Sequence, residues 1–180
     1  MELVRTGRLL VRAWTSSEDD LARLADLYGR AEVTRWLSGP PAGGVQAMLE
    51  RWAAVHAADP RAGCWAVQPL DGSPVAGTVL LKPLPAGDGE FEVGWHFHPD
   101  SWGRGYATEA AAAVVRRAFE DGLPEVFAVV RPGNEPSLAV CRRLGMTPLG
   151  RTTRWYGVEC EAFGLAPSGG SAGVGASVGA

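Results

Sequence analysis

The sequence lacks the features by which several large classes of protein are recognised. No apolar run approaches the roughly 20 residues of a membrane-spanning helix, and the N-terminus carries no apolar signal core. The cysteines Cys64, Cys141 and Cys160 stand far apart and show no metal-binding spacing. Isolated cysteines of this kind are typical of a reducing compartment, so we expect a reduced cytoplasmic protein that does not bind a membrane.

The chain also has fewer basic than acidic residues. The chain has 17 basic against 20 acidic residues and a formal net charge of -3, which argues against nucleic-acid binding through bulk charge. Lys82 is its one lysine. With 180 residues, 46% of them hydrophobic, the chain is long enough for one globular domain with a real core. We assign that domain to residues 1–166, and we expect residues 167–180, rich in Gly, Ala and Ser, to form a disordered tail.

Apolar alternation and turn residues predict strands that are interrupted by helices. The expected strands span residues 8–13, 63–69, 75–82, 90–97, 125–131, 146–150 and 155–165. The expected helices follow residues 15–18, span 33–37, 45–58 and 134–144, and begin after the glycines at 103–105. The strand at 125–131 is apolar along its length, so it should be buried on both faces. This order predicts a mixed α/β (α+β) fold with one central, mostly antiparallel sheet of about seven strands and helices on both faces.

Two of these helices carry boundary signals. Thr15-Ser-Ser-Glu18 has the form of a capping box, in which Thr15 caps the helix and Glu18 returns to the backbone N–H of Thr15. The amphipathic stripe behind it consists of Leu21, Leu24, Leu27 and Tyr28. The helix after the glycines should end at Gly122. Its apolar face consists of Ala111, Val114, Val115, Ala118 and Phe119.

The most informative stretch is HPDSWGRGYATEA, residues 98–110. It follows the strand at 90–97, passes Gly103 and Gly105, and enters an alanine-rich helix. The first turn of a helix has backbone N–H groups without intrahelical partners and lies at the positive end of the helix dipole, so it suits a phosphate. Glycine adopts positive φ and lets a ligand approach the backbone closely. We therefore predict a phosphate site at the glycine loop, defined here as residues 102–105.

The glycine loop differs from the two best-known nucleotide motifs. No Lys-Ser/Thr pair follows its glycines, which argues against a P-loop, and position 108 is Thr where the dinucleotide fingerprint G-x-G-x-x-G ends in glycine. The pattern W-G-x-G-Y-A-T-E-A instead resembles the pyrophosphate loop, Q/R-x-x-G-x-G/A, of the GNAT N-acetyltransferase superfamily. Trp102 stands at the Q/R position, and Gly105 and Ala107 take the last two. A tryptophan at that first position resembles the branch of ribosomal-protein N-terminal (alanine/serine) acetyltransferases.

Two further stretches resemble the same family in the same order. The opening, GRLLVRAW…EDDLARLADLY…EVTRWL, is similar to the first strand and the acceptor-wall helices of that branch. NEPSLAVCRRLGM, residues 134–146, is similar to the superfamily segment N-x-x-S/A-x-x-x-Y-x-x-x-G-F. The resemblance implies an enzyme that moves an acetyl group from acetyl-CoA to a primary amine, either a protein N-terminal α-amine or a small molecule. The amine would attack directly in a ternary complex.

The resemblance also implies which residues bind acetyl-CoA. The end of the strand at 90–97 would offer backbone groups to the pantetheine arm, from His96, Phe97 and His98. The diphosphate would be held by the glycine loop and the first helical turn, through Gly103, Arg104, Gly105, Tyr106, Ala107 and Thr108. Asn134 would hold the pantetheine arm with its side chain. An asparagine here is also an ordinary helix N-cap, and the two roles are compatible.

Glu92 and Ser137 are the residues to which the resemblance gives catalytic roles. Glu92, on the strand that leads to the glycine loop, is the expected general base and would act through water, with Glu90 as the alternative if the strand register slips by two. Many members carry a tyrosine that protonates the departing thiolate, but that position here is Cys141. Ser137, one turn earlier on the same helix face, is therefore the expected proton donor. Cys141 and Tyr156 are the alternatives.

Three questions stay open at the level of sequence. His96 and His98 share one strand face and could bind a metal, but no third ligand stands at convincing spacing, so we expect no metal. The missing family tyrosine at Cys141 favours a rival class, a CoA-binding module that has lost catalysis and serves as a sensor or partner. A homodimer is possible, and no residue pattern selects the acceptor.

Overall fold

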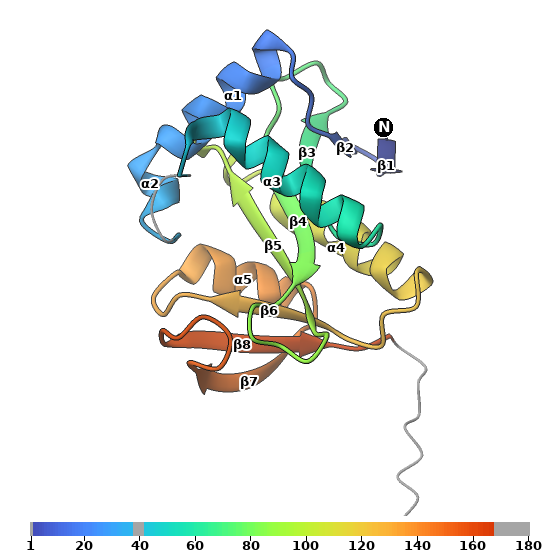
Figure 1. Cartoon of the computed structure of the whole chain (residues 1–180), viewed down its shortest axis with the longest axis vertical. Helices are drawn as coiled ribbons and strands as arrows, with labels where there is room; N and C mark the ends of the chain where they lie inside the picture. Colours follow the sequence, from blue (N-terminus) through green and yellow to red (C-terminus); the bar gives the residue numbers. More distant parts are fainter. Residues whose placement is uncertain (1, 38–41, 168–180) are drawn as a thin grey trace, which may run out of the picture.

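The computed structural model describes residues 2–37 and 42–167, so the predicted tail lies outside the described residues from position 168 onward. The strands are β1 (Glu2–Arg5), β2 (Leu9–Ala13), β3 (Gly63–Pro69), β4 (Gly77–Pro83), β5 (Phe91–Phe97), β6 (Val126–Val130), β7 (Thr147–Thr152) and β8 (Cys160–Leu165). The helices are α1 (Glu18–Gly29), α2 (Ala31–Thr34), α3 (Gly44–Ala58), α4 (Tyr106–Glu120) and α5 (Glu135–Arg143), with a 3-10 turn, η1 (Pro99–Ser101), after β5 (Figure 1). Within the described ranges, no helix is long and apolar enough to cross a membrane.

The strands form one eight-stranded sheet in the order β1-β2-β3-β4-β5-β6-β8-β7. Neighbouring strands run antiparallel except for β5 and β6, which are parallel and share a single registered pair, Glu92 opposite Phe127. Beyond that pair the two strands diverge, and Figure 1 shows them running at a wide angle to each other. The predicted mostly antiparallel sheet is confirmed. The sequence prediction missed β1, a short strand at the edge of the sheet whose residues are exposed or half-buried.

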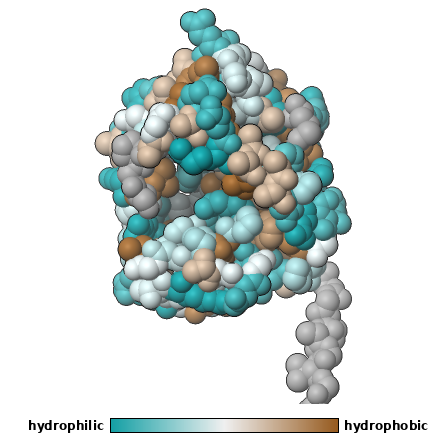
Figure 2. Space-filling model, in the orientation of Figure 1, coloured by the Kyte–Doolittle hydropathy of each residue, from teal (hydrophilic) through white to brown (hydrophobic). Residues whose placement is uncertain are grey.

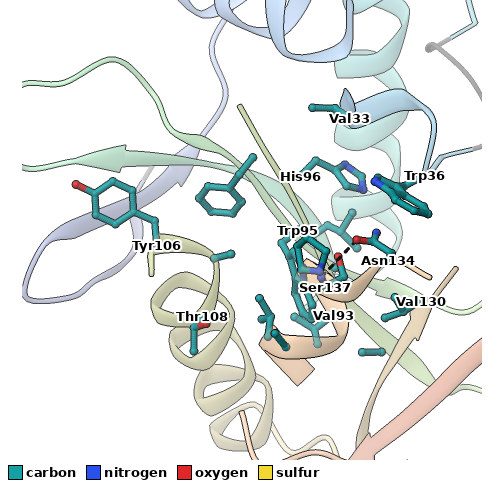
Figure 3. A pocket seen from close by; sticks show the side chains of 18 of the residues that line it. Val33, Trp36, Val93, Trp95, His96, Tyr106, Thr108, Val130, Asn134 and Ser137 are labelled. Carbon is teal, nitrogen blue, oxygen red and sulfur yellow. Dashed lines mark hydrogen bonds between the residues drawn. The ribbon is translucent and has the colours of Figure 1, made fainter. Parts of the chain in front are cut away.

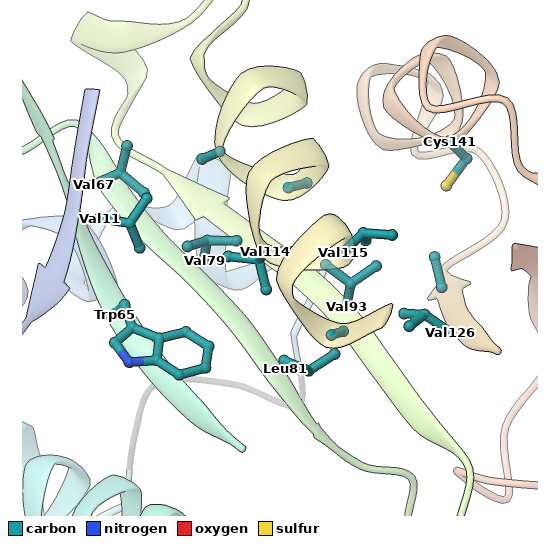
Figure 4. Packing of buried hydrophobic residues seen from close by; sticks show 14 of the residues in the cluster. Val11, Trp65, Val67, Val79, Leu81, Val93, Val114, Val115, Val126 and Cys141 are labelled. Atoms are coloured by element: carbon teal, nitrogen blue, oxygen red, sulfur yellow. The ribbon is translucent and has the colours of Figure 1, made fainter. Parts of the chain in front are cut away.

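Helices cover both faces of the sheet, as predicted. On one face α4 packs on Leu81 of β4 and Val93 of β5, and α5 contributes Cys141 to the same buried cluster (Figure 4). On the other face α1 and α3 enclose a second cluster that includes Leu24, Met48 and Ala66. Because successive side chains of a strand point to opposite faces, β5 supplies core residues to the first face and leaves Glu92 and His96 on the second.

The predicted capping box before α1 is wrong. Ser17, and not Thr15, caps the helix, and its side chain accepts a hydrogen bond from the backbone N–H of Asp20. Asp20 is buried, and its carboxylate accepts from the Arg12 guanidinium at 2.8 Å and from the Thr15 N–H at 2.8 Å. Burial by itself would raise the pKa of Asp20, but these hydrogen bonds and the charge of Arg12 outweigh it, so the pKa is lowered. The local sequence pattern could not predict this ion pair, because Arg12 lies on β2 and Asp20 on α1.

The prediction that the strand at 125–131 is buried on both faces is also wrong. Val126, Ala128 and Val130 of β6 are buried in the main core, whereas Phe127 and Val129 are only partly buried. These two side chains lie on the face of the sheet that carries Glu92, where Trp155 covers them incompletely. The apolar run of β6 therefore has one face in the main core and a second face that is only partly buried.

Most other boundaries agree with the predictions within a few residues. The exceptions are the short helix α2, which ends at Thr34, and the last strand, which was expected at 155–165 and begins only at Cys160. Residues 153–159 form a loop between β7 and β8, closed by a hydrogen bond of 2.9 Å from the Gly157 N–H to the Thr153 carbonyl. Gly157 has φ of +67°, a conformation that a continuous strand through this segment does not allow. This loop carries Tyr156.

Candidate active site

A cavity of about 1120 Å³ opens where β5 and β6 part. Its walls come from both faces of the sheet, because it is lined by Thr108 of α4 and Ser137 of α5 on one face and by Trp36, Glu92 and Tyr156 on the other. Figure 2 shows this side of the molecule hollowed between its upper and lower halves, and Figure 3 shows the cavity from close by. A ligand can therefore reach from one face of the sheet to the other through the gap.

The glycine loop forms one end of this cavity and has the backbone geometry that the sequence predicts. Gly103 and Gly105 have φ of +75° and +76°, and Gly105 is the N-cap of α4. A Cβ at Gly103 would meet nothing within 4 Å, and one at Gly105 would meet only the Arg8 guanidinium at 3.6 Å. The N–H groups of the first turn of α4, including those of Ala107 and Thr108, have no partner within the helix. The glycine loop is thus an open site lined by backbone N–H donors.

The first turn of α4 is held in place by the segment just before β2. Arg8 Nε donates to Glu109 at 2.8 Å, and Thr6 Oγ1 donates to the same carboxylate at 2.6 Å. Arg8 also donates to the Arg104 carbonyl at 3.1 Å, and its guanidinium lies over the Tyr106 ring. Tyr106 is buried, and in Figure 3 its ring points away from Ser137. These contacts hold the glycine loop in place and leave its backbone N–H donors accessible.

Trp102 and His98 secure the strand side of the loop. Trp102 is half exposed, and its indole N–H donates to the Phe97 carbonyl at 2.8 Å. The imidazole of His98 lies 2.9 Å from carboxylate oxygens of both Asp26 and Asp100 and does not line the cavity. The backbone N–H and carbonyl of His98 bond within the protein as well. The structure therefore places His98 outside the site, whereas Phe97 remains in the cavity wall.

His96 lies on the opposite face of β5 from the main core. Its Nδ1 is 2.9 Å from the Tyr28 hydroxyl, and the two rings pack edge to face. Burial, and then the nearby charge of Lys82, lowers the pKa of His96 to about 4, so the imidazole is neutral at pH 7. Within the described ranges no group of three or more His, Cys, Asp or Glu residues gathers in a way that could hold a metal ion.

The start of α5 brings Asn134 and Ser137 to the cavity. Asn134 is the N-cap, and its side-chain oxygen accepts from the Ser137 N–H at 3.4 Å (Figure 3). Both residues line the cavity. Cys141, one turn later, is fully buried in the main core, and burial raises the pKa of its thiol to about 12. Of these two candidates on α5, only Ser137 faces the cavity.

Glu92 lies on the other face with two partners that the sequence did not assign to it. The Tyr156 hydroxyl donates to Glu92 Oε1, and Lys82 Nζ lies 2.9 Å from the same oxygen. Lys82 Nζ also lies 3.2 Å from the Tyr156 oxygen. All three residues line the cavity, and we refer to them as the Glu92 cluster. Glu90 instead pairs with Arg154 at 2.7 Å and does not line the cavity, so it is not brought to the site.

Sequence reasoning missed Lys82 and Arg8, and it placed Tyr156 on a strand as a donor to the thiolate. A usable signal existed for Lys82, which is the one lysine in a chain with sixteen arginines. Lys82 is opposite Glu92 in the β4–β5 register, so the predicted hairpin order already made the pair possible. No local pattern pointed to Tyr156, because it reaches Glu92 from a loop 64 residues away.

Comparison with known proteins identifies the class to which this fold and site belong. The family model of the acetyltransferase (GNAT) domain matches residues 8–147 of this sequence. The chain therefore belongs to the GNAT acetyltransferase family, and it is an acetyl-CoA-dependent acetyltransferase. This confirms the family that the glycine loop and the segment at 134–146 predicted.

Individual relatives agree with this assignment. The N-acetyltransferase YoaA of Bacillus subtilis is 26% identical over 147 residues, which cover 79% of this chain and 81% of the relative. YnaD of the same organism is 38% identical over 61 residues, only 33% of this chain and 36% of that relative. An acetyltransferase from Agrobacterium tumefaciens superposes with a TM-score of 0.76 at 25% identity, covering 93% and 95% of the two chains. The fold is also shared with RimL, a ribosomal L7/L12 α-N-protein acetyltransferase in complex with coenzyme A, with a TM-score of 0.74, 16% identity and coverage of 92% and 98%.

Proposed function

We propose that this enzyme transfers an acetyl group from acetyl-CoA to a primary amine of low pKa, such as a protein N-terminal α-amine or a small-molecule amine, by direct attack in a ternary complex. The observation that carries the proposal is the cavity through the divided sheet. It has the open N–H groups of α4 on one side and the Glu92 cluster on the other. Donor and acceptor would meet between β5 and β6.

The donor side suits a diphosphate. Open space where a Cβ would stand at Gly103 leaves the backbone accessible, and each hydrogen bond from an N–H to a charged phosphate contributes roughly 1.5–3 kcal/mol. Arg143 of α5 and Arg8 line the same cavity, so they are better placed for phosphates than Arg104, whose side chain is exposed and does not line it. Asn134 would orient the pantetheine arm beside β5. Acetyl-CoA supplies an already activated thioester.

The acceptor side favours an amine that arrives uncharged. The Glu92 carboxylate is already paired with Lys82, so no free carboxylate is offered to an ammonium group there, and Lys82 repels one. Deprotonating an α-amine of pKa about 7.7–8.0 at pH 7 costs only ~1–1.4 kcal/mol, whereas a lysine side chain of pKa about 10.4 costs ~4.6 kcal/mol. We therefore expect α-amines to be preferred over lysine side chains and polyamines.

Glu92 and Ser137 have complementary roles in this proposal. Glu92 accepts the proton that the amine loses when it attacks, and Ser137 supplies a proton to the departing thiolate. The two residues line opposite faces of the same cavity, which matches the two ends of the reaction. Proximity of the amine and the thioester carbonyl accounts for much of the remaining rate enhancement.

Substituting Ser137 separates catalysis from packing on α5. We expect Ser137→Ala to lower kcat by about 10- to 100-fold, because it removes the hydroxyl that protonates the thiolate and leaves the Asn134 cap on the backbone N–H intact. Cys141→Ser should instead lower the free energy of unfolding by about 1–3 kcal/mol, because it buries a hydroxyl in the core. Steady-state kinetics and thermal melts check both. The reverse order of kcat losses would assign the proton donor to Cys141.

The proposed function is tested by an acceptor screen. Protein and acetyl-CoA are mixed with peptides that have free N-termini, with N-terminally blocked lysine peptides, and with polyamines, and release of the CoA thiol is followed. We expect turnover with the free N-termini or small low-pKa amines and at least about 10-fold lower kcat/KM for the lysine side chain at pH 7. Tight acetyl-CoA binding without turnover on any amine would favour the rival function, a catalytically inactive CoA-binding sensor.

A further inference from the structure

The Glu92 cluster points to a role for Tyr156 that the family assignment does not supply. We propose that the Tyr156 hydroxyl receives the proton of the attacking amine and passes its own proton to Glu92. This inference rests on the proposed function and deepens it, since it names the group that contacts the acceptor amine. Lys82 is a positioning residue in this scheme, because it acts through Glu92 and Tyr156.

Exposure decides which member of the cluster meets the acceptor first. Both Tyr156 and Glu92 line the cavity, but Tyr156 is 38% exposed and Glu92 only 7%. The loop at 153–159 lays the phenol over the carboxylate, and the hydroxyl proton is already committed to Glu92 Oε1. An amine that enters from this side reaches the phenol oxygen before it reaches the carboxylate.

The hydrogen bonds leave the phenol oxygen able to accept the amine proton. A hydroxyl has one proton and two lone pairs. The proton of Tyr156 goes to Glu92, and one lone pair faces Lys82 Nζ at 3.2 Å. The second lone pair remains for the amine. The ammonium of Lys82 also makes the phenol a better proton donor toward Glu92.

The ionisation state of Tyr156 is consistent with a relay and not with a phenolate base. Burial, and then the negative charge of Glu92, raises the pKa of Tyr156, so the phenol stays protonated at neutral pH. A protonated phenol can gain a proton only as it loses one. Transfer through Tyr156 therefore requires Glu92 as the final acceptor, which is the arrangement that the structure provides.

The step balances in atoms and charge. The amine nitrogen forms a bond to the acetyl carbon, and the bond from that carbon to sulfur breaks. The amine proton moves to the Tyr156 oxygen, the former Tyr156 proton moves to Glu92, and the thiolate takes a proton from Ser137. Glu92 then releases its proton to solvent, and Ser137 regains one. The products are the amide and the free thiol of coenzyme A.

Tyr156→Phe tests the relay, because it keeps the ring over Lys82 and removes only the hydroxyl. With the best acceptor from the screen we expect kcat to fall by about 100-fold at pH 7, with unchanged affinity for acetyl-CoA. The loss should shrink toward pH 9, where hydroxide and buffer take the amine proton instead. Val158→Ala, in the same loop and exposed, is the matched control and should keep wild-type kinetics.

Two outcomes overturn the relay. A loss in Tyr156→Phe that is the same at every pH and is accompanied by weaker acetyl-CoA binding means that the ring only shapes the cavity. Wild-type kinetics in Tyr156→Phe together with a large loss in Glu92→Gln means that the amine proton reaches Glu92 through its other oxygen, Oε2. In both cases turnover by the wild-type enzyme still supports the proposed function, whereas an inactive wild-type enzyme argues against that function itself.

Discussion

Replacing Glu92 with glutamine is expected to lower kcat by about 10²–10⁴-fold and to leave acetyl-CoA affinity unchanged. The amide keeps the size of the side chain but cannot take up the proton of the attacking amine. The effect should be largest at low pH, where hydroxide and buffer accept the amine proton least readily in place of Glu92. Rate profiles between pH 6 and 9, together with direct measurement of acetyl-CoA binding, check this result.

The matched control for this substitution is Glu90→Gln. Glu90 stands two residues earlier, pairs with Arg154 and lies outside the cavity, so the same chemical change there should leave kcat and its pH dependence as in the wild type. Loss of activity in Glu90→Gln with a normal Glu92→Gln enzyme would reverse the two assignments. An unchanged pH–rate profile in Glu92→Gln would remove the base role altogether.

Gly105→Val is expected to raise the dissociation constant for acetyl-CoA by about 10- to 100-fold, which corresponds to the loss of about one hydrogen bond to phosphate. Gly105 is the N-cap of α4 with φ of +76°, a conformation in which a β-branched residue is strained. Relief of that strain turns the glycine loop and redirects the N–H groups of the first helical turn. Calorimetric titration with acetyl-CoA measures the change.

Gly122→Val separates strain from ligand binding. Gly122 lies just after α4 with φ of +88°, and a Cβ there would meet nothing within 4 Å, so the substitution introduces a similar strain away from the cavity. The strained backbone should lower the free energy of unfolding of both variants by about 1–3 kcal/mol. Both should therefore unfold at a lower temperature than the wild type. Only Gly105→Val should weaken acetyl-CoA binding. Equal weakening in both would mean that the loop has no direct part in holding the cofactor.

Features that depend on neighbouring residues were predictable from the sequence. The glycine loop, the helix after it and its end at Gly122 follow from glycine conformations and an apolar repeat, and the structure has them where they were expected. Asn134 is the N-cap that its position before α5 predicted. In the same way, alternation along β5 put Glu92 and His96 on one face of the sheet.

Features that depend on distant residues were not predictable in this way. Thr15-Ser-Ser-Glu18 was expected to form a capping box, but Ser17 caps α1, and Arg12 on β2 and the Thr15 backbone bind the buried Asp20. His98 was expected to offer backbone groups to the pantetheine arm, but its N–H donates to the Ala76 carbonyl, and Asp26 of α1 holds its side chain outside the cavity. In both cases contacts with residues from other parts of the chain outweighed the local pattern.

The sequence by itself determined the family, the sheet with its covering helices, and the loop and strand from which a donor site can be built. The family follows from the resemblance of the glycine loop and of residues 134–146 to known motifs, and the strands, helices and loop follow from periodicity and from the conformations of glycine, which act over a few residues. Only the tertiary structure decided that β5 and β6 part to open a cavity, and that Lys82 and Tyr156 converge on Glu92. Such convergence depends on how strands are paired and loops folded over them, and contacts across 64 residues leave no periodic trace in the chain.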